Sequence, residues 1–496
     1  MAQQSYKERH EDFVTGLQGG PISEIYIVMA VAIVCYFSWA ALQSRWFYFK
    51  NGYALNSLIA DFALNWLGCL LSITVYSTTP LLLSTLIIVP GAIIAVSEGI
   101  NKSLLREVKT KKLSKDETTA DESLSLASYL PRKSYLSVYR GGMMVATCLA
   151  ILAVDFHIFP RRFAKVETWG TSLMDMGVGS FVFSMGLVSS RTTLVDRFLS
   201  KRTPRFKAIG VALRQSLTIL FLGTGRLFLV KNLDYQEHVT EYGVHWNFFM
   251  TLGLLPPFVA IIDFMPDCVP TGLTGLLIAI GYEFLLDQTS LGAYVLTAPR
   301  TDMISANKEG IFSFLGYLAI FLVGKATGFY VLPSVTSFKS YLYPLGKEEI
   351  QQPTASSNDT RRRVAFLLLS SSFAYSLLLY IVSRWLTPSR RLANFPYMLW
   401  VVSFNTMFLA LFILVESLLL PDQLAYGLKV PASLEAINRN GLVIFLLANV
   451  STGLVNINIQ TLDVSKPIAL MILILYAVAI FGVSLLMAKY GLYIKL

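Results

Sequence analysis

Long apolar segments separated by short polar ones recur from one end of the chain to the other, and this pattern sets the fold class. Each apolar segment has about 20 residues, the length of helix that crosses the hydrocarbon core of a bilayer. The segments do not alternate between apolar and polar residues, as strands of a membrane barrel would. We therefore predict an all-α, polytopic membrane bundle of about thirteen transmembrane helices, with residues 1–496 forming a single domain. The expected spans are residues 25–43, 54–77, 79–99, 136–156, 171–190, 208–230, 244–264, 269–288, 310–331, 364–386, 396–419, 439–459 and 467–488.

The composition supports this class of protein. Hydrophobic residues make up 54% of the chain and charged residues only 15%, whereas soluble domains carry roughly 25% charged residues. The first apolar segment begins near Ile25, behind a polar stretch that is too charged to be the start of a cleaved signal peptide, so we read it as a membrane anchor. The four cysteines lie in or beside apolar segments without metal-ligand spacing, which indicates packing residues.

Basic residues predict the orientation of the chain. Lys and Arg are roughly twice as frequent in one set of alternate loops as in the other, and the basic side of a membrane protein faces the cytosol. Thirteen spans then place the amino terminus in the lumen and the carboxyl terminus in the cytosol. The loops near residues 101–134 and 333–363 become cytosolic connectors, and their polar composition indicates flexibility. The net charge of +10 therefore reports topology, and no nucleic-acid partner is expected.

The connection between the fourth and fifth spans, residues 155–175, concentrates chemistry in a short luminal loop. Asp155 ends a very apolar helix, where loss of solvent would raise its pKa and make it a usable general base. Lys165 could supply a cation to a developing oxyanion or hold the aspartate in place. The structural alternative is a salt bridge that joins two helix ends.

Further charged residues of this loop suit a phosphate-bearing substrate. Arg161 and Arg162 carry planar guanidinium groups that bind phosphate through paired hydrogen bonds, although anchoring to lipid headgroups would explain them equally well. Asp175 lies three residues after Ser172 at the start of a span, a spacing typical of a capping box, so a structural role is favoured.

Residues 231–249 form a second polar luminal segment with two of the four histidines, His238 and His245. Histidine titrates near neutral pH and could act as acid or base. The seven-residue step between these histidines lacks the pattern of a zinc protease, so we predict no metal site.

Polar residues within the spans are the third group, because their burial in lipid is costly and often marks a cavity or a bundle interior. Asp61 and Asn65 share one helix face, as do Glu283 and Asp287. Asn449, Thr452 and Asn456 form a polar stripe in the twelfth span. Hydrogen bonding between helices is an equally good explanation for such stripes.

With these residues in view, the chain resembles the family of GPI-anchored wall transfer proteins (PIG-W), and most closely its fungal members. The resemblance spreads over nearly the whole chain. It is carried by residues 10–20, 61–66, 153–186, 232–249, 307–317 and 446–456, of which DFHIFPRRFAKVETWGTSLMD and NLDYQEHVTEYGVHWNFF belong to the longest and most specific blocks.

The resemblance implies a multi-pass enzyme of the endoplasmic reticulum membrane. It would transfer a palmitoyl group from acyl-CoA, its co-substrate, to the inositol of glucosaminyl-phosphatidylinositol during GPI-anchor biosynthesis, with no permanently bound cofactor. The family's catalytic aspartate and lysine match Asp155 and Lys165, and the implied topology agrees with the loop charges.

The chemistry of acyl transfer then suggests roles for the remaining residues. Asp155 would take the proton of the inositol hydroxyl, directly or through His245, while Lys165 stabilises the oxyanion. An apolar slot lined by Val178, Phe181 and Phe183 would hold the acyl chain. The expected substrate-binding residues are Arg161, Arg162, Glu167, Trp169, Asp175, Val178, Phe181, Phe183, Trp246, Asn247, Asp61 and Asn449.

Two other functions fit a membrane bundle with buried polar residues. One is a lipid or solute transporter, although the chain lacks matching broken helices in two halves. The other is a non-catalytic subunit of a membrane complex. Acyl transfer by the purified chain alone would exclude both.

Overall fold

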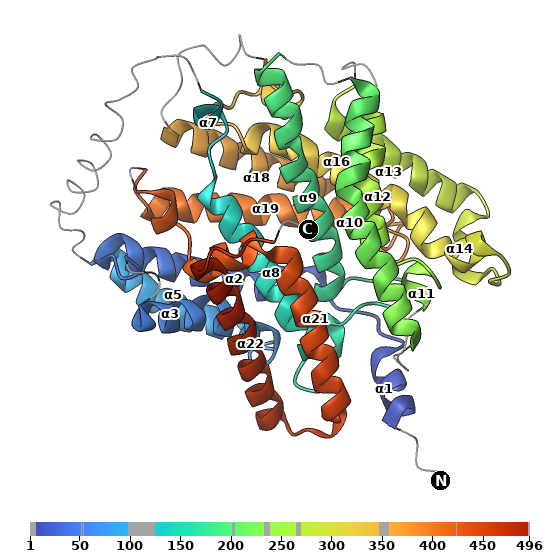
Figure 1. Ribbon diagram of the computed structural model, residues 1–496, viewed down its shortest axis with the longest axis horizontal. Coiled ribbons are helices and arrows are strands. Elements are labelled where there is room, and N and C mark those ends of the chain that lie inside the picture. Colours follow the sequence, from blue (N-terminus) through green and yellow to red (C-terminus); the bar gives the residue numbers. More distant parts are fainter. Residues whose placement is uncertain are drawn as a thin grey trace.

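The computed structural model describes residues 6–50, 52, 54–97, 125–200, 204–232, 239–263, 269–346, 357–422 and 424–494. Throughout this part of the chain the regular elements are helices, and the single backbone bridge pairs Gly19 with Thr171. The all-α prediction is confirmed (Figure 1). Of the predicted connectors, residues 101–124 and 347–356 lie outside the described residues, while most of 333–363 is described and includes the start of a long helix at Ser357.

Ten helical segments of the described chain are long and apolar enough to cross a membrane, which confirms the polytopic class. They are α2 (Ile22–Trp46), the continuous run α3 (Leu55–Asp61), η1 (Phe62–Leu67) and α4 (Gly68–Ile73), α8 (Ser134–Ala153), α9 (Leu173–Phe198), α10 (Arg205–Asn232), α16 (Lys308–Val331), α18 (Ser357–Val382), α19 (Phe395–Leu419), α21 (Gly441–Asn458) and α22 (Lys466–Lys489).

The other three predicted spans also coincide with helices, which are α5 (Pro80–Val96), α12 (Phe248–Ile262) and α13 (Thr271–Gln288). The 15 residues of α12 rise only about 22 Å, less than the roughly 30 Å of a bilayer core. The count of thirteen crossings therefore stays a prediction.

Short helices connect these segments. They are α1 (Tyr6–Val14), α7 (Leu126–Tyr129), α11 (Val239–Tyr242), α14 (Leu291–Thr297), α15 (Met303–Ala306) and α20 (Ala432–Arg439), with the 3₁₀ turns η2 (Arg161–Phe163), η3 (Lys339–Tyr341), η4 (Tyr426–Leu428) and η5 (Thr461–Asp463).

The interior is built around α9, α16 and α19. Glycines let α9 and α16 approach closely, because a Cβ added at Gly186 would collide with the Phe321 carbonyl and one added at Gly324 would collide with the Phe183 carbonyl. Small residues serve this purpose in membrane helices, where close backbone packing replaces the hydrophobic effect. One wall of the bundle is therefore tightly packed.

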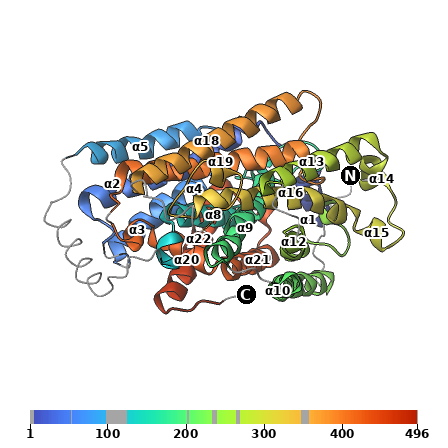
Figure 2. The ribbon, with the colours of Figure 1, turned by 90° about the horizontal axis from the view of Figure 1, so that it is seen from above.

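The opposite edge of the bundle is looser. Helix α10 packs mainly on α12, and α21 packs mainly on α8 and α22. Figure 2 shows α10, α12 and α21 along one edge of the molecule and α5 and α18 along the other. Only 17% of the residues in the apolar window of α10, and likewise of α21, are buried, so this edge presents two lightly supported helices to the lipid.

Candidate functional site

A cavity of about 1220 Å³ runs through the bundle beside α8. One face of α8 lines it from Tyr139 to Ile151, with wall residues that recur every three or four positions. These twelve steps rise roughly 18 Å along the helix, and Asp155 lines the cavity just beyond the end of α8. The other walls come from α1, α2, α9, α10, α11, α12, α19, α21 and the loops that follow α8, α11 and α18.

Small residues make room for the cavity. A Cβ added at Gly142 of α8, Gly177 of α9, Gly225 of α10 or Gly453 of α21 would meet no other atom within 4 Å, and all four glycines lie on the cavity wall. The space is therefore bounded on several sides by helix backbone.

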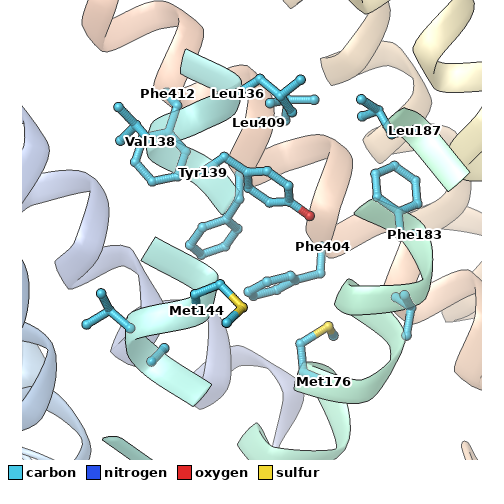
Figure 3. Packing of buried hydrophobic residues seen from close by; sticks show 14 of the residues in the cluster. Leu136, Val138, Tyr139, Met144, Met176, Phe183, Leu187, Phe404, Leu409 and Phe412 are labelled. Carbon is cyan, nitrogen blue, oxygen red and sulfur yellow. The ribbon is translucent and has the colours of Figure 1, made fainter. Parts of the chain in front are cut away.

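The deep end of the cavity is aromatic. Phe404, Phe408 and Phe412 of α19 lie there with Tyr139, whose hydroxyl donates a 2.6 Å hydrogen bond to Asn405 Oδ1. Figure 3 shows Tyr139, Phe404 and Phe412 gathered between α8 and α19. This end is apolar, and the buried polar pair of Tyr139 and Asn405 is satisfied internally.

Asp155 lies at the opposite, polar end of the cavity. It follows the last turn of α8 and is 6% exposed. Asn456 of α21 donates a 2.8 Å hydrogen bond from Nδ2 to Asp155 Oδ2. Donation to the ionised form stabilises a carboxylate at the carboxyl end of a helix, where the helix dipole opposes negative charge.

Lys165 lies on the same cavity wall but pairs with a different carboxylate. Its ammonium is 2.8 Å from Glu241 Oε1 and 3.1 Å from Glu241 Oε2. Glu241 also accepts a 2.9 Å hydrogen bond from Arg390 Nη1, and both Glu241 and Arg390 line the cavity. The salt bridge that the structural alternative expected at Lys165 is thus made with Glu241.

Arg390 extends this network to Asp175. Its Nε is 2.6 Å from Asp175 Oδ1, and the pKa of Arg390 is raised because the nearby carboxylates of Glu241 and Asp175 outweigh the lowering effect of burial. The Ser172 hydroxyl and the Val166 N–H donate to Asp175 Oδ2 at 2.7 and 3.1 Å. Asp175 is fully buried and lies behind the cavity wall. Ser172 also accepts the Asp175 N–H as the helix cap that the sequence predicted.

The two adjacent arginines bind other parts of the protein and do not line the cavity. Arg161 Nη2 donates to the carbonyls of Val154 and Phe159 at 2.6 and 3.0 Å, and its guanidinium lies 3.8 Å from the Phe13 ring centroid. Burial lowers the pKa of Arg161 to about 10, with the Asp155 charge acting in the opposite direction. Arg162 Nε is 2.8 Å from Glu24 Oε1.

The second polar segment, residues 231–249, contributes side chains to the cavity wall and others that connect neighbouring helices. Trp246 and Asn247 line the cavity, whereas His245 does not. The side chain of Asn247 caps α12 and also donates to the Gly223 carbonyl of α10 at 2.8 Å. The backbone N–H of His245 donates to Asn307 Oδ1 at 2.7 Å. His238 lies outside the described residues.

Of the other residues predicted to bind substrate, some line the cavity and some do not. Val178, Phe181, Glu167 and Asn449 line the cavity. Phe183 is fully buried on the far side of α9, since it lies five residues from Val178 and so on a different helix face. Trp169 is 45% exposed and also lies outside the cavity wall.

Asp61 serves a separate structure. Its Oδ2 accepts the Ser433 N–H at 2.9 Å and its Oδ1 accepts the Ser433 hydroxyl at 2.8 Å. Ser433 lies in the first turn of α20, whose backbone N–H groups have no partner within that helix. Asp61 thus caps α20 from another helix, away from the cavity.

Metal coordination has no support in the described part of the chain, where no cluster of three or more His, Cys, Asp or Glu side chains could hold an ion. Cys35, Cys69 and Cys148 are buried free thiols.

Sequence reasoning did not assign Glu241, Arg390 or Asn456 to the site. Arg390 and Arg391 carried a usable signal, because they lie in a short luminal loop of the predicted topology, where basic residues are disfavoured. Asn456 belonged to the polar stripe of the twelfth span, but one helix cannot reveal which neighbour its stripe faces.

Comparison with known proteins gives one consistent family. The GWT1 family model matches residues 6–487. Relatives named GPI-anchored wall transfer protein 1 are 45% identical in Gibberella zeae over 515 residues and 44% identical in Yarrowia lipolytica over 504, each covering 99% of this chain and 99% and 100% of the relative. The relative of that name in Saccharomyces cerevisiae is 44% identical over 498 residues, with 99% of both chains covered.

Proposed function

The chain belongs to the GWT1 family, and we propose that it is an acyltransferase of GPI-anchor biosynthesis in the endoplasmic reticulum membrane. It moves a fatty acyl group, palmitoyl by family resemblance, from acyl-CoA to the inositol of glucosaminyl-phosphatidylinositol. The observation that carries this proposal is that one cavity has Asp155 and Lys165 on its wall at the polar end and an apolar groove along α8 behind them.

The proposed reaction uses both groups. The inositol hydroxyl oxygen attacks the thioester carbonyl while Asp155 accepts the hydroxyl proton. Negative charge then develops on the carbonyl oxygen, and a nearby ammonium group stabilises such an oxyanion. When the carbon–sulfur bond breaks, the CoA thiolate leaves and takes up the proton that Asp155 had accepted, so the products are acylated inositol and free CoA.

Lys165 keeps capacity for this role while it is paired. An ammonium group carries three N–H donors, and the two hydrogen bonds described for Lys165 both go to Glu241. The third donor can serve the oxyanion. Asn456, by donating to Oδ2 of Asp155, fixes the orientation of the proposed base.

The shape of the cavity supports a lipid-sized pair of substrates. The groove along α8 gives the acyl chain an apolar surface, and the phospholipid acceptor enters from the bilayer between α10 and α21. These two helices flank the lower part of α9 in Figure 1, and all three contribute to the wall.

Reconstitution tests the function directly. The purified full-length chain in vesicles receives acyl-CoA and glucosaminyl-phosphatidylinositol, and acylated glycolipid is measured by mass spectrometry. We expect product that depends on both substrates. Vesicles that move the glycolipid or CoA across the bilayer without forming product would favour the transporter. If the chain transfers acyl groups only when a second protein is added, it would be a non-catalytic subunit of a membrane complex.

A further inference from the structure

The side chain of Lys165 is long, 42% exposed and carried by an irregular loop. A free lysine of this kind samples many rotamers, and ordering it costs up to about 2 kcal/mol of side-chain entropy. A catalytic cation must nevertheless be held close to the reacting oxygen. Some other part of the protein therefore has to restrict it.

A closed circuit of contacts supplies that restriction. The ammonium of Lys165 binds Glu241, Glu241 binds Arg390, and Arg390 binds Asp175. Asp175 then accepts the N–H of Val166, the residue directly after Lys165. The circuit thus returns to its starting point and holds the lysine at its ammonium and at its backbone.

Arg390 is the only member of this circuit that comes from the second half of the chain. It lies in the loop between α18 and α19 and is 5% exposed. Its guanidinium donates hydrogen bonds to two carboxylates, from Nε to Asp175 and from Nη1 to Glu241. A lysine is a single point charge without this fork, so it cannot reproduce the bridge.

We propose that Arg390 is a positioning residue for the acyl transfer, which acts through Glu241 to hold the Lys165 ammonium at the polar end of the cavity. This inference rests on the proposed function for its catalytic meaning. The positioning itself can be measured without any substrate.

The neighbouring residue offers a matched control. Arg391 is 8% exposed, pairs with the buried Glu309 at 3.0 Å, and lies 3.5 Å from the Thr168 hydroxyl of the same loop that carries Lys165. Its ion pair does not reach Lys165 or Glu241. Arg391→Lys therefore disturbs a similar buried pair without touching the circuit.

The first measurement is the rate at which an amine-reactive reagent modifies Lys165 in the full-length protein, followed by peptide mass spectrometry. In Arg390→Lys we expect this rate to rise about fivefold, the factor that corresponds to losing a partly exposed ion pair. The same rise is expected in Glu241→Gln, which cuts the circuit beside Lys165. Arg391→Lys should label like the wild type.

The second measurement is the turnover of folded enzyme. In Arg390→Lys we expect kcat to fall about tenfold to hundredfold, the loss that follows from misplacing a catalytic group by about 1 Å, with KM for acyl-CoA little changed. Arg391→Lys should retain kcat. Thermal stability in detergent is recorded for every variant.

The outcomes separate the two proposals. Unchanged labelling of Lys165 in a folded Arg390→Lys protein overturns the positioning role, whatever the enzyme does. If Arg390→Lys does not fold, unchanged labelling and kcat in Glu241→Gln overturn it. Faster labelling in a chain whose wild type transfers no acyl group would support the positioning and refute the proposed function.

Discussion

The two ends of the cavity are built on opposite principles. At the polar end, Asn456 donates to Asp155, and Glu241 binds both Lys165 and Arg390 through short hydrogen bonds. At the deep end, aromatic side chains of α19 face a helix surface that small residues keep open. Under the proposed function, we expect the polar end to control the rate and the deep end to control the choice of acyl chain.

Asp155→Asn should have the largest effect. The substitution keeps the size of the side chain and a hydrogen-bonding group but removes the proton acceptor, so the rate should fall on the order of 10²- to 10⁴-fold. The loss should be the same for short and long acyl chains, as measured by transfer to the glycolipid in vesicles. Near wild-type transfer by a folded variant would exclude Asp155 as the base.

Lys165→Met should have the second-largest effect on the rate of acyl transfer. It keeps the apolar stem and removes the cation, and loss of an oxyanion partner costs roughly 10²- to 10³-fold in rate. If the two residues act as one unit, the double variant should be little slower than the slower single variant. Additive losses in the same assay would mean that they serve separate steps.

Gly142→Leu tests the deep end. A side chain at this position enters open space on the cavity wall, so the variant should fold and shorten the groove. We expect the preference for long over short acyl-CoA to fall about tenfold or more, since each buried CH₂ group contributes about 0.8 kcal/mol. Competition between acyl-CoAs of different length measures this ratio.

Gly281→Leu is its control, because Gly281 of α13 also faces open space but lies outside the cavity wall. An unchanged length ratio in Gly142→Leu, or an equal change in both variants, would place chain selection elsewhere.

Arg162→Ala should have the smallest effect on the reaction. The structure uses Arg162 to join Glu24 of α2 to the loop after α8, and a partly exposed pair of this kind contributes about 0–1 kcal/mol. We expect a slightly lower melting temperature. The sequence-based hypothesis of phosphate binding predicts instead a raised KM for the phosphate-bearing acceptor, and kinetics at varied acceptor concentration distinguish the two.

Hydropathy predicted the fold well because lipid imposes one rule on every crossing segment. Each of the thirteen predicted spans coincides with a helix. However, α12 has only 15 residues, which is shorter than a helix that crosses the bilayer core. Periodicity within one helix is less informative. It could group Val178 with Phe181, but it could not say that Phe183 faces the α16 side of α9, where Gly324 packs against its backbone.

The candidate site was only partly visible in the sequence. Asp155 and Lys165 stood out because charges cluster in a short loop and because that loop resembles a known family. Their partners did not, since Asn456 lies 301 residues from Asp155 and Arg390 lies 149 from Glu241. Pairings over such separations depend on how the helices pack, which no local pattern encodes.

The cap that Asp61 provides for α20 has a consequence for the protein during its synthesis. Its partner Ser433 is 372 residues away, so at 5–20 residues per second the ribosome needs roughly 20 to 70 seconds to deliver it. Throughout that interval Asn65, one turn along the same helix and 2.8 Å from Asp61 Oδ1, is the partner already made. A nascent chain that stops before α20 therefore lacks both hydrogen bonds that Ser433 donates to Asp61 in the finished protein.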